Sequence, residues 1–190
     1  MNVYDFDKTI FRVDSTAAFY RHCLRRHPKI ARHWPIQLVY ALRYLAGRID
    51  KTRMKQCFYR FLPDIPELDR EIAAFWAQNM GRIEPWYLAQ RRPDDVIISA
   101  SPYFLLSPLL EGRLAVGALM ASNVDPSTGR YHGINCHGQE KVRRYQEVFG
   151  ATPVDNFYSD SLSDTPMARL ARHAFLVKKG TLSPWPKEQL

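Results

Sequence analysis

Short apolar runs alternate with helical stretches over the second half of the chain, and this alternation restricts the possible fold more than any other feature. The apolar runs that predict strands are 96–99, 114–123, 154–158 and 174–177. The stretches between or beside them that predict helices are 84–91, 102–111, 138–149 and 164–172. Strands separated by helices indicate a mainly parallel sheet with helices on both faces. The sequence therefore predicts a doubly wound α/β fold.

A long helical stretch follows the first strand, which is predicted over 2–6. Residues 15–80 show helical periods broken by prolines and a glycine, without strand-like alternation. In open α/β sheets, chemistry gathers beyond the carboxyl ends of the strands, where an insertion after the first strand would lie. We therefore predict a Rossmann-like core of 1–14 and 81–190, with 15–80 as an inserted α-helical cap. The turn residues at 125–129 predict a hairpin.

Two carboxylates stand at the end of the first strand, in the run Asp5-Phe6-Asp7-Lys8-Thr9. Residues two apart on a strand point to the same side, so Asp5 and Asp7 can face one site. A carboxylate can attack phosphorus, and a bound Mg²⁺ would remove the repulsion between the two anions. The second carboxylate is then free for proton transfer. The alternative is that both acids only cap the following turn.

Three more polar signals follow later strand ends or open a helix. Ser99 ends an apolar strand and can donate to a phosphoryl oxygen, although it can also be a helix cap. Lys141 lies near the start of a predicted helix, where it either balances anionic charge or is an ordinary exposed lysine. Asp160 and Asp164 follow another strand, and Asp164 can cap a helix or orient its neighbours.

These four signals, in this order and across almost the whole chain, resemble the haloacid dehalogenase superfamily of phosphohydrolases. The helical insertion after the first motif resembles subfamily IB, which contains the phosphoserine phosphatases. The resemblance implies that Asp5 is nucleophile and metal ligand, and that Asp7 is the general acid/base with its carbonyl on the metal. It implies phosphate binding by Thr9, Ser99 and Lys141, Mg²⁺ ligation by Asp160, and support from Asp164. The implied reaction is Mg²⁺-dependent hydrolysis of a phosphomonoester through an aspartyl-phosphate.

The substrate is less constrained by the motifs. The chain has Ser-Ala-Ser-Pro at 99–102, whereas phosphoserine phosphatases typically have Ser-Gly-Gly-Phe there. Asp14 falls where that family places a glutamate near the substrate's ammonium, but it can equally be the N-cap of the first cap helix. We expect a small phosphorylated metabolite as substrate.

The positive charge of the chain is concentrated in the predicted cap. The net charge is +8, and residues 20–60 contain eleven Lys or Arg and a single acid, Asp50. This predicts an acidic partner: a phosphorylated substrate, an anionic membrane surface or a nucleic acid. The apolar stretch 34–46, bordered by basic residues, resembles the bacterial phosphatidylglycerophosphate phosphatases. A lipid phosphatase at the inner membrane surface is therefore an alternative, against a cap helix that simply packs on its neighbours.

A basic nucleic-acid-binding module is a second alternative. The chain has neither a helix-turn-helix signature nor zinc-ligand spacing, so we expect no specific nucleic acid. A catalytically dead scaffold is opposed by the full set of motif residues. Because the acidic run starts at residue 5 and no apolar stretch reaches about 18 residues, we expect a cytoplasmic protein, peripheral at the membrane if the lipid alternative holds. The oligomeric state is not indicated.

Overall fold

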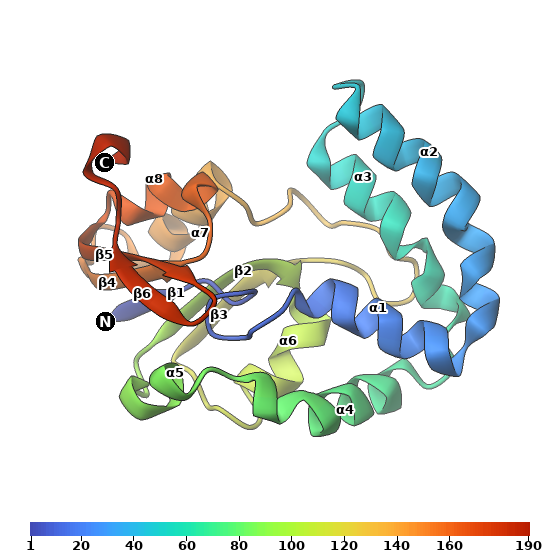
Figure 1. Ribbon diagram of the computed structural model, residues 1–190, viewed down its shortest axis with the longest axis horizontal. Coiled ribbons are helices and arrows are strands. Elements are labelled where there is room, and N and C mark those ends of the chain that lie inside the picture. Colours follow the sequence, from blue (N-terminus) through green and yellow to red (C-terminus); the bar gives the residue numbers. More distant parts are fainter.

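The computed structural model describes residues 1–190, and its centre is a six-stranded sheet with helices on both faces (Figure 1). The strands are β1 (Asn2–Tyr4), β2 (Val96–Pro102), β3 (Ala118–Ser122), β4 (Val154–Ser159), β5 (Ala171–Lys178) and β6 (Thr181–Pro184). Their order is β3-β2-β1-β4-β5-β6, with β6 antiparallel to β5 and all other pairs parallel. The predicted doubly wound α/β fold is confirmed.

Eight α-helices join or cover these strands. They are α1 (Ser15–Arg26), α2 (Trp34–Leu45), α3 (Lys51–Phe58), α4 (Leu68–Asn79), α5 (Pro85–Gln90), α6 (Tyr103–Leu110), α7 (Gln139–Phe149) and α8 (Thr165–Ala168). Short 3₁₀ turns lie at Pro28–His33, Tyr59–Asp64, Met80–Arg82, Leu162–Asp164 and Lys187–Gln189. Asp14 and Asp50 cap α1 and α3, because each side chain accepts a hydrogen bond from a backbone N–H of the first turn.

Side chains alternate between the two faces of the sheet, as expected for strands. Val3 and Tyr4 are neighbours on β1, yet Val3 belongs to the cluster beneath α7 and α8, whereas Tyr4 belongs to the larger cluster with α4 and α6. Val96 and Ile97 on β2 divide between the clusters in the same way. Each strand at the centre is therefore buried on both faces.

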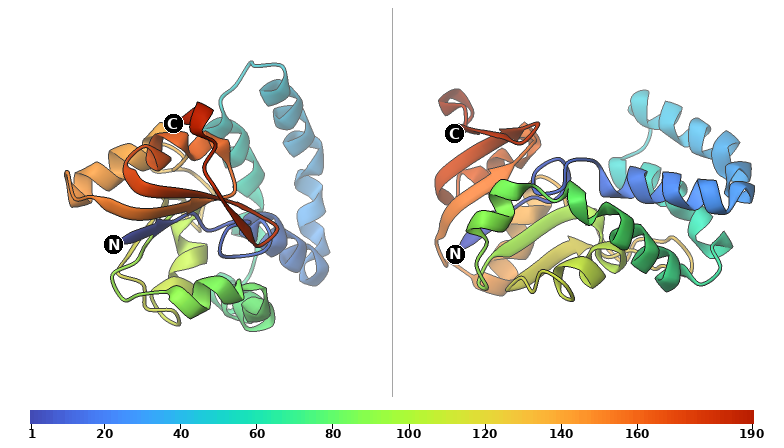
Figure 2. Two further views of the ribbon diagram at one scale, coloured as in Figure 1. Left: turned by 60° about the vertical axis from the view of Figure 1, so that its left-hand side comes forward. Right: turned by 60° about the horizontal axis from the view of Figure 1, so that its bottom comes forward.

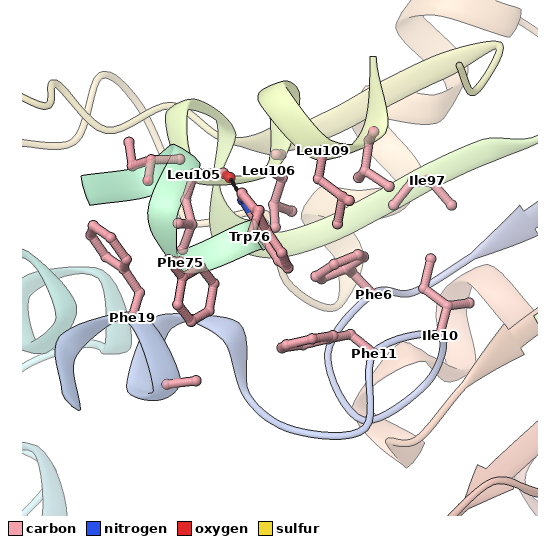
Figure 3. Packing of buried hydrophobic residues seen from close by; sticks show 14 of the residues in the cluster. Phe6, Ile10, Phe11, Phe19, Phe75, Trp76, Ile97, Leu105, Leu106 and Leu109 are labelled. Carbon is pink, nitrogen blue, oxygen red and sulfur yellow. Dashed lines mark hydrogen bonds between the residues drawn. The ribbon is translucent and has the colours of Figure 1, made fainter. Parts of the chain in front are cut away.

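The larger cluster extends from the sheet into the inserted helices (Figure 3). Trp76 of α4 packs edge-on against Phe6 and Phe11, and its Nε1 donates to the carbonyl oxygen of Leu105 at 2.6 Å. Phe19 of α1 packs against the same cluster. The helices α1 and α4 are thus anchored to the core by shared aromatic packing.

The helices α2 and α3 stand away from the sheet and lie side by side (Figures 1 and 2). No residue of α2 is fully buried, and α3 buries only Cys57. Within the proposed division of the chain into core and cap, α2 and α3 are therefore the part of the cap that shares least packing with the core.

Two local predictions are wrong in detail, and a third is confirmed only in part. The helix predicted over 164–172 ends at Ala168, because β5 begins at Ala171 and pairs with β4. The strand predicted from 114 begins at Ala118, since Leu114 is buried beside α6 rather than in the sheet. The hairpin predicted at 125–129 is present only as a single antiparallel bridge between Val124 and Tyr131, without extended strands. The Asp125 carboxylate closes its loop by accepting from Ser127 and Thr128.

The antiparallel strand β6 was not predicted at all. Its signal is the pair Lys179-Gly180, which forms a two-residue hairpin turn with φ values of 49° and 80°. Two consecutive positive φ angles are typical of the tight turns that match strand twist, and glycine favours them. Strand β5 is also longer than the predicted 174–177, because pairing with β4 begins it at Ala171 and the hairpin with β6 extends it to Lys178.

Candidate active site

A cleft of about 200 Å³ opens at the carboxyl ends of β1, β2 and β4. Its lining comes from residues on both sides of the insertion and from α3, which supplies Lys51 and Lys55. The other lining residues are Asp5, Asp7, Lys8, Asp14, Ala100, His137, Lys141, Asp160, Ser161, Ser163 and Asp164. Most of the residues predicted from the motifs therefore meet at one place. The exceptions are Thr9 and Ser99, which lie behind the surface of the cleft.

Lys141 is the centre of a buried charge network. Its Nζ donates to Asp5 Oδ1 at 2.6 Å and to Asp164 Oδ2 at 2.7 Å, and its side chain is 2% exposed. Burial by itself lowers the pKa of Lys141, but the two carboxylates outweigh burial and raise this pKa above its ordinary value. Asp164 Oδ2 also accepts from Ser159 Oγ at 2.8 Å. A charged lysine thus ties the ends of β1 and β4 to α7.

Asp5 continues the sheet beyond β1, because its backbone N–H donates to the carbonyl oxygen of Tyr158 at 2.8 Å. Burial raises the pKa of the Asp5 carboxyl to about 7, although Lys141 acts in the opposite direction. Thr9 is fully buried, and its Oγ1 lies 3.4 Å from Asp5 Oδ2. The contact that Thr9 makes in the structure is with Asp5, and its role toward phosphate stays a prediction.

Asp7 is held from two sides. Its Oδ1 accepts from the backbone N–H of Ser15 at 2.7 Å, and its Oδ2 accepts from Ser101 Oγ at 2.5 Å. Burial, with a contribution from the nearby Asp14, raises the pKa of Asp7 to about 6. Sequence reasoning missed Ser15 and Ser101, although the two-residue spacing from Ser99 to Ser101 was a usable signal.

The remaining predicted residues lie at different depths. Ser99 is fully buried, and its Oγ accepts from the Ser101 N–H at 3.1 Å. Asp160 lines the cleft, and burial raises the pKa of its carboxyl. Asp14 both caps α1 and lines the cleft, so the two alternatives considered for it are compatible in space.

Two lysines of α3 reach the cleft and were not predicted. Lys55 Nζ donates to the carbonyl oxygen of Ala100 at 3.0 Å and to Asn135 Oδ1 at 3.3 Å. Lys51 lies one turn earlier on the same face of the helix, and burial lowers the pKa of both lysines. Their i, i+4 spacing in the basic stretch was the available signal, but only packing shows which basic residues point into the cleft.

The oxygen ligands in the cleft fit a magnesium ion. Asp164 Oδ1 is buried without a hydrogen-bond partner, and the Asp5 and Asp160 carboxylates line the same space. No three His, Cys, Asp or Glu side chains form a ready-made metal cluster. Mg²⁺ typically takes only one or two carboxylates in proteins and completes its shell with water and phosphate oxygens. The donor set therefore fits an ion that is held jointly with a phosphorylated ligand.

A family model described as haloacid dehalogenase-like hydrolase matches residues 3–169. The chain belongs to this family. The match spans every motif residue, from Asp5 to Asp164, and it confirms the prediction of an enzyme of this superfamily. No curated protein matches the sequence significantly.

Several solved structures share the fold. A protein of unknown function from Bordetella pertussis Tohama I superposes with a TM-score of 0.71 at 20% identity, over 92% of this chain and 87% of the other. A HAD family hydrolase from Salmonella enterica serovar Typhi has a TM-score of 0.56 at 16% identity, over 89% and 59%. A phosphoserine phosphohydrolase-like protein from Francisella tularensis has 0.54 at 13%, over 92% and 86%.

The raised pKa of Asp7 predicts a pH-dependent cost to stability. A carboxyl whose pKa is about 6 when folded, against about 4 when unfolded, destabilises the fold increasingly as pH rises from 4 to 6. In the absence of divalent metal we expect Asp7→Asn to raise the free energy of unfolding by about 1–3 kcal/mol at pH 8 and not at pH 4. Urea denaturation at both pH values measures this. The exposed Asp69→Asn should show no such gain, and an equal effect of Asp7→Asn at both pH values would contradict the explanation.

Proposed function

We propose that this chain is a Mg²⁺-dependent phosphatase that hydrolyses a small phosphomonoester through a phosphorylated Asp5. The observation that carries the proposal is the arrangement at the end of β1. Asp5 and Asp7 share one cleft, but Asp5 is paired with Lys141, whereas Asp7 is bound by Ser15 and Ser101. Two carboxylates with different partners suit two different roles.

Asp5 is the proposed nucleophile. Its carboxylate oxygen would form a bond to phosphorus while the bond from phosphorus to the ester oxygen breaks, giving an aspartyl-phosphate and an alcohol. Asp7 would give its proton to the departing oxygen and then take a proton from the water that attacks the aspartyl-phosphate. A carboxyl with a pKa of about 6 can both give and take a proton near neutral pH. This attack releases phosphate and restores Asp5.

The remaining residues would bind charge around the reacting groups. Lys141 keeps its positive charge and balances that of Asp5 and the phosphoryl group. Asp5, Asp160 and the backbone carbonyl of Asp7 would hold Mg²⁺, which supplies charge neutralisation and orientation. Thr9 and Ser99 would act from behind the cleft surface, on Asp5 and on a phosphoryl oxygen.

The size of the cleft supports a small substrate. Its volume of about 200 Å³ is below the range of about 300–1,000 Å³ that most small-molecule sites occupy, which favours a small phosphorylated metabolite, and Lys51 and Lys55 add positive charge on the cap side. The similarity in fold to a phosphoserine phosphohydrolase-like protein supports phosphatase chemistry. Asp14 is the cap-side residue that we propose to contact the substrate.

The proposal is tested by phosphate release from a panel of phosphomonoesters that includes phosphoamino acids, sugar phosphates and lipid phosphates. With Mg²⁺ we expect turnover of at least one ester, and with a chelator a loss of at least about 100-fold, equal to about 2.7 kcal/mol of transition-state stabilisation. Phosphate release that is unaffected by the chelator would contradict the dependence on Mg²⁺. Release from none of the esters would contradict the assignment as a phosphatase.

A lipid phosphate remains a second candidate because of α2. Its outward face is apolar, with Trp34, Leu38, Leu42 and Leu45 exposed by 53%, 61%, 57% and 79%. Such a face suits the interface of a membrane, and basic residues border it. Every helix in the structure is too short or too polar to span a bilayer. Higher activity on lipid phosphates than on soluble esters would favour this candidate, whereas no feature of the fold supports the nucleic-acid alternative.

A further inference from the structure

A second, larger hollow lies on the opposite side of α3 from the cleft. It has a volume of about 870 Å³ and shares no lining residue with the cleft. Five arginines line it, and we define it by them as the arginine hollow: Arg32, Arg43, Arg53, Arg60 and Arg130. We propose that the arginine hollow is a second binding site, which takes the phosphate groups of a multiply charged anionic ligand.

The helical period of α3 separates the two sites. Arg53, Gln56 and Cys57 of α3 lie on the face toward the hollow, and Arg60 continues this side in the 3₁₀ turn that follows the helix. Lys51 and Lys55 lie on the other face, toward the cleft. The basic residues of the stretch 20–60 are therefore divided between the cleft and the arginine hollow.

Several further segments complete the walls of the hollow, including the 3₁₀ turns Pro28–His33 and Tyr59–Asp64. Tyr40 and Arg43 extend from α2, and Ser127, Thr128 and Arg130 come from the loop after β3. This loop is fixed against α3, because a Cβ on Gly129 would lie 2.3 Å from the carbonyl oxygen of Tyr59. The hollow is thus built by residues within 32–64 and by the loop at 127–130, which are distant in sequence, and a ligand in it would join them.

The charges of the hollow are not balanced by the protein. Its single acid is Asp64, whose oxygens are bound by Arg32 and by His33 Nε2 at 2.6 Å. The other four arginines of the hollow form no ion pair in the structure. Asp125, in the same loop as Arg130, has its carboxylate bound by Ser127 and Thr128. Four exposed guanidinium groups facing one space repel one another, and an anion would remove that repulsion.

Phosphate is the anion that this chemistry fits. A guanidinium presents paired N–H donors that match two phosphate oxygens, which a lysine cannot do. The amide of Gln56 lines the hollow and adds a neutral donor, because its oxygen accepts from the Tyr131 N–H and its nitrogen is left to donate. The hydroxyls of Ser127 and Thr128 already donate to Asp125. The volume lies within the range of about 300–1,000 Å³ that small-molecule sites occupy. The phosphates could belong to a soluble metabolite or to lipid headgroups.

Pyrophosphate binding tests the site. Calorimetry at low salt, with a chelator present to prevent turnover, compares the wild type with the double variant Arg53→Gln/Arg130→Gln. We expect at least tenfold weaker binding in this variant, and loss of the rise in Tm that pyrophosphate causes in the wild type. The matched control Arg113→Gln/Lys187→Gln removes two exposed charges elsewhere and should bind like the wild type. None of these substitutions lies in the cleft, so any pyrophosphate that binds in the cleft contributes equally in all three proteins, and a difference between them reports on the arginine hollow.

Vesicle sedimentation separates the two sources of phosphate. If lipid headgroups are the ligand, vesicles of phosphatidylcholine mixed with phosphatidylglycerol should sediment the wild type but not the double variant. If the variant loses only pyrophosphate binding and still sediments with vesicles like the wild type, the ligand is soluble. Arg53→Lys/Arg130→Lys keeps the charge but not the paired donors, and should show an intermediate affinity even if the glutamine variant is poorly folded. Equal binding of both probes by the wild type and the arginine variants would overturn the proposal, whether or not the chain is a phosphatase.

Discussion

Asp5→Asn is expected to lower kcat/KM for phosphate release by at least about 10⁴-fold, the order of loss seen when a covalent nucleophile is removed from an enzyme. An amide cannot form the aspartyl-phosphate, but it has nearly the same shape as the carboxylate. The fold should survive, because Lys141 keeps its ion pair with Asp164 and the Asp5 backbone keeps its hydrogen bond to Tyr158. Steady-state release from the best ester of the panel, with Mg²⁺ present, measures the loss.

The matched control for this prediction is Asp69→Asn, which removes an exposed carboxylate on α4. It should retain the wild-type rate, so that any loss in Asp5→Asn is not a general effect of charge. A rate near that of the wild type in Asp5→Asn, with circular dichroism showing a native fold, would contradict the assignment of Asp5 as nucleophile.

Lys141→Met is expected to have the largest effect on stability. The substitution removes the cation between Asp5 and Asp164 and leaves two buried carboxylates without a counter-charge. Breaking a buried ion pair in this way costs about 3–5 kcal/mol. We therefore expect the free energy of unfolding at pH 8 to fall by that amount, and phosphate release to be lost with it. Urea denaturation measures the first effect.

The pH dependence of this loss distinguishes charge from packing. Without Lys141, the pKa of Asp5 in the folded state rises further above its unfolded value of about 4. The folded variant then binds protons more readily, so its deficit relative to the wild type should shrink as pH falls from 8 toward 5. The exposed Lys187→Met should show no deficit at either pH. A deficit in Lys141→Met that does not change with pH would point to lost packing instead.

The sequence was a good guide wherever the periodicity was long. Strands β2, β3 and β4 were found from their apolar runs, although β3 begins later than predicted, and the helices between them were found because their apolar positions repeat with the helical period. The predictions failed where tertiary pairing overrides local pattern. Residues 171 and 172, which were predicted to end the helix α8, instead begin β5 because they pair with β4. Strand β6 forms because the Lys179-Gly180 turn places it antiparallel to β5.

The motif residues were also accessible from the sequence, for a physical reason. The carboxyl ends of parallel strands meet at one edge of a sheet, so polar residues that follow different strands come together whatever the rest of the chain does. Their individual contacts were not accessible in this way. Thr9 contacts Asp5 and Ser101 binds Asp7 because of how the side chains at the ends of β1 and β2 pack, and this packing is not visible in the sequence.

The sequence by itself determined the α/β class and the meeting of Asp5, Asp7, Lys141, Asp160 and Asp164, because the alternation of strands and helices and the position of these residues after strands or at a helix start suffice for both. The order of the strands in the sheet was not predicted. Only the tertiary structure decided how the basic cap is used. A run of lysines and arginines shows that an anion is expected, but not where each side chain points. The packing of α3 between α2, the sheet edge and the loop at 125–130 turns Lys51 and Lys55 toward the cleft and Arg53 and Arg60 toward a separate hollow.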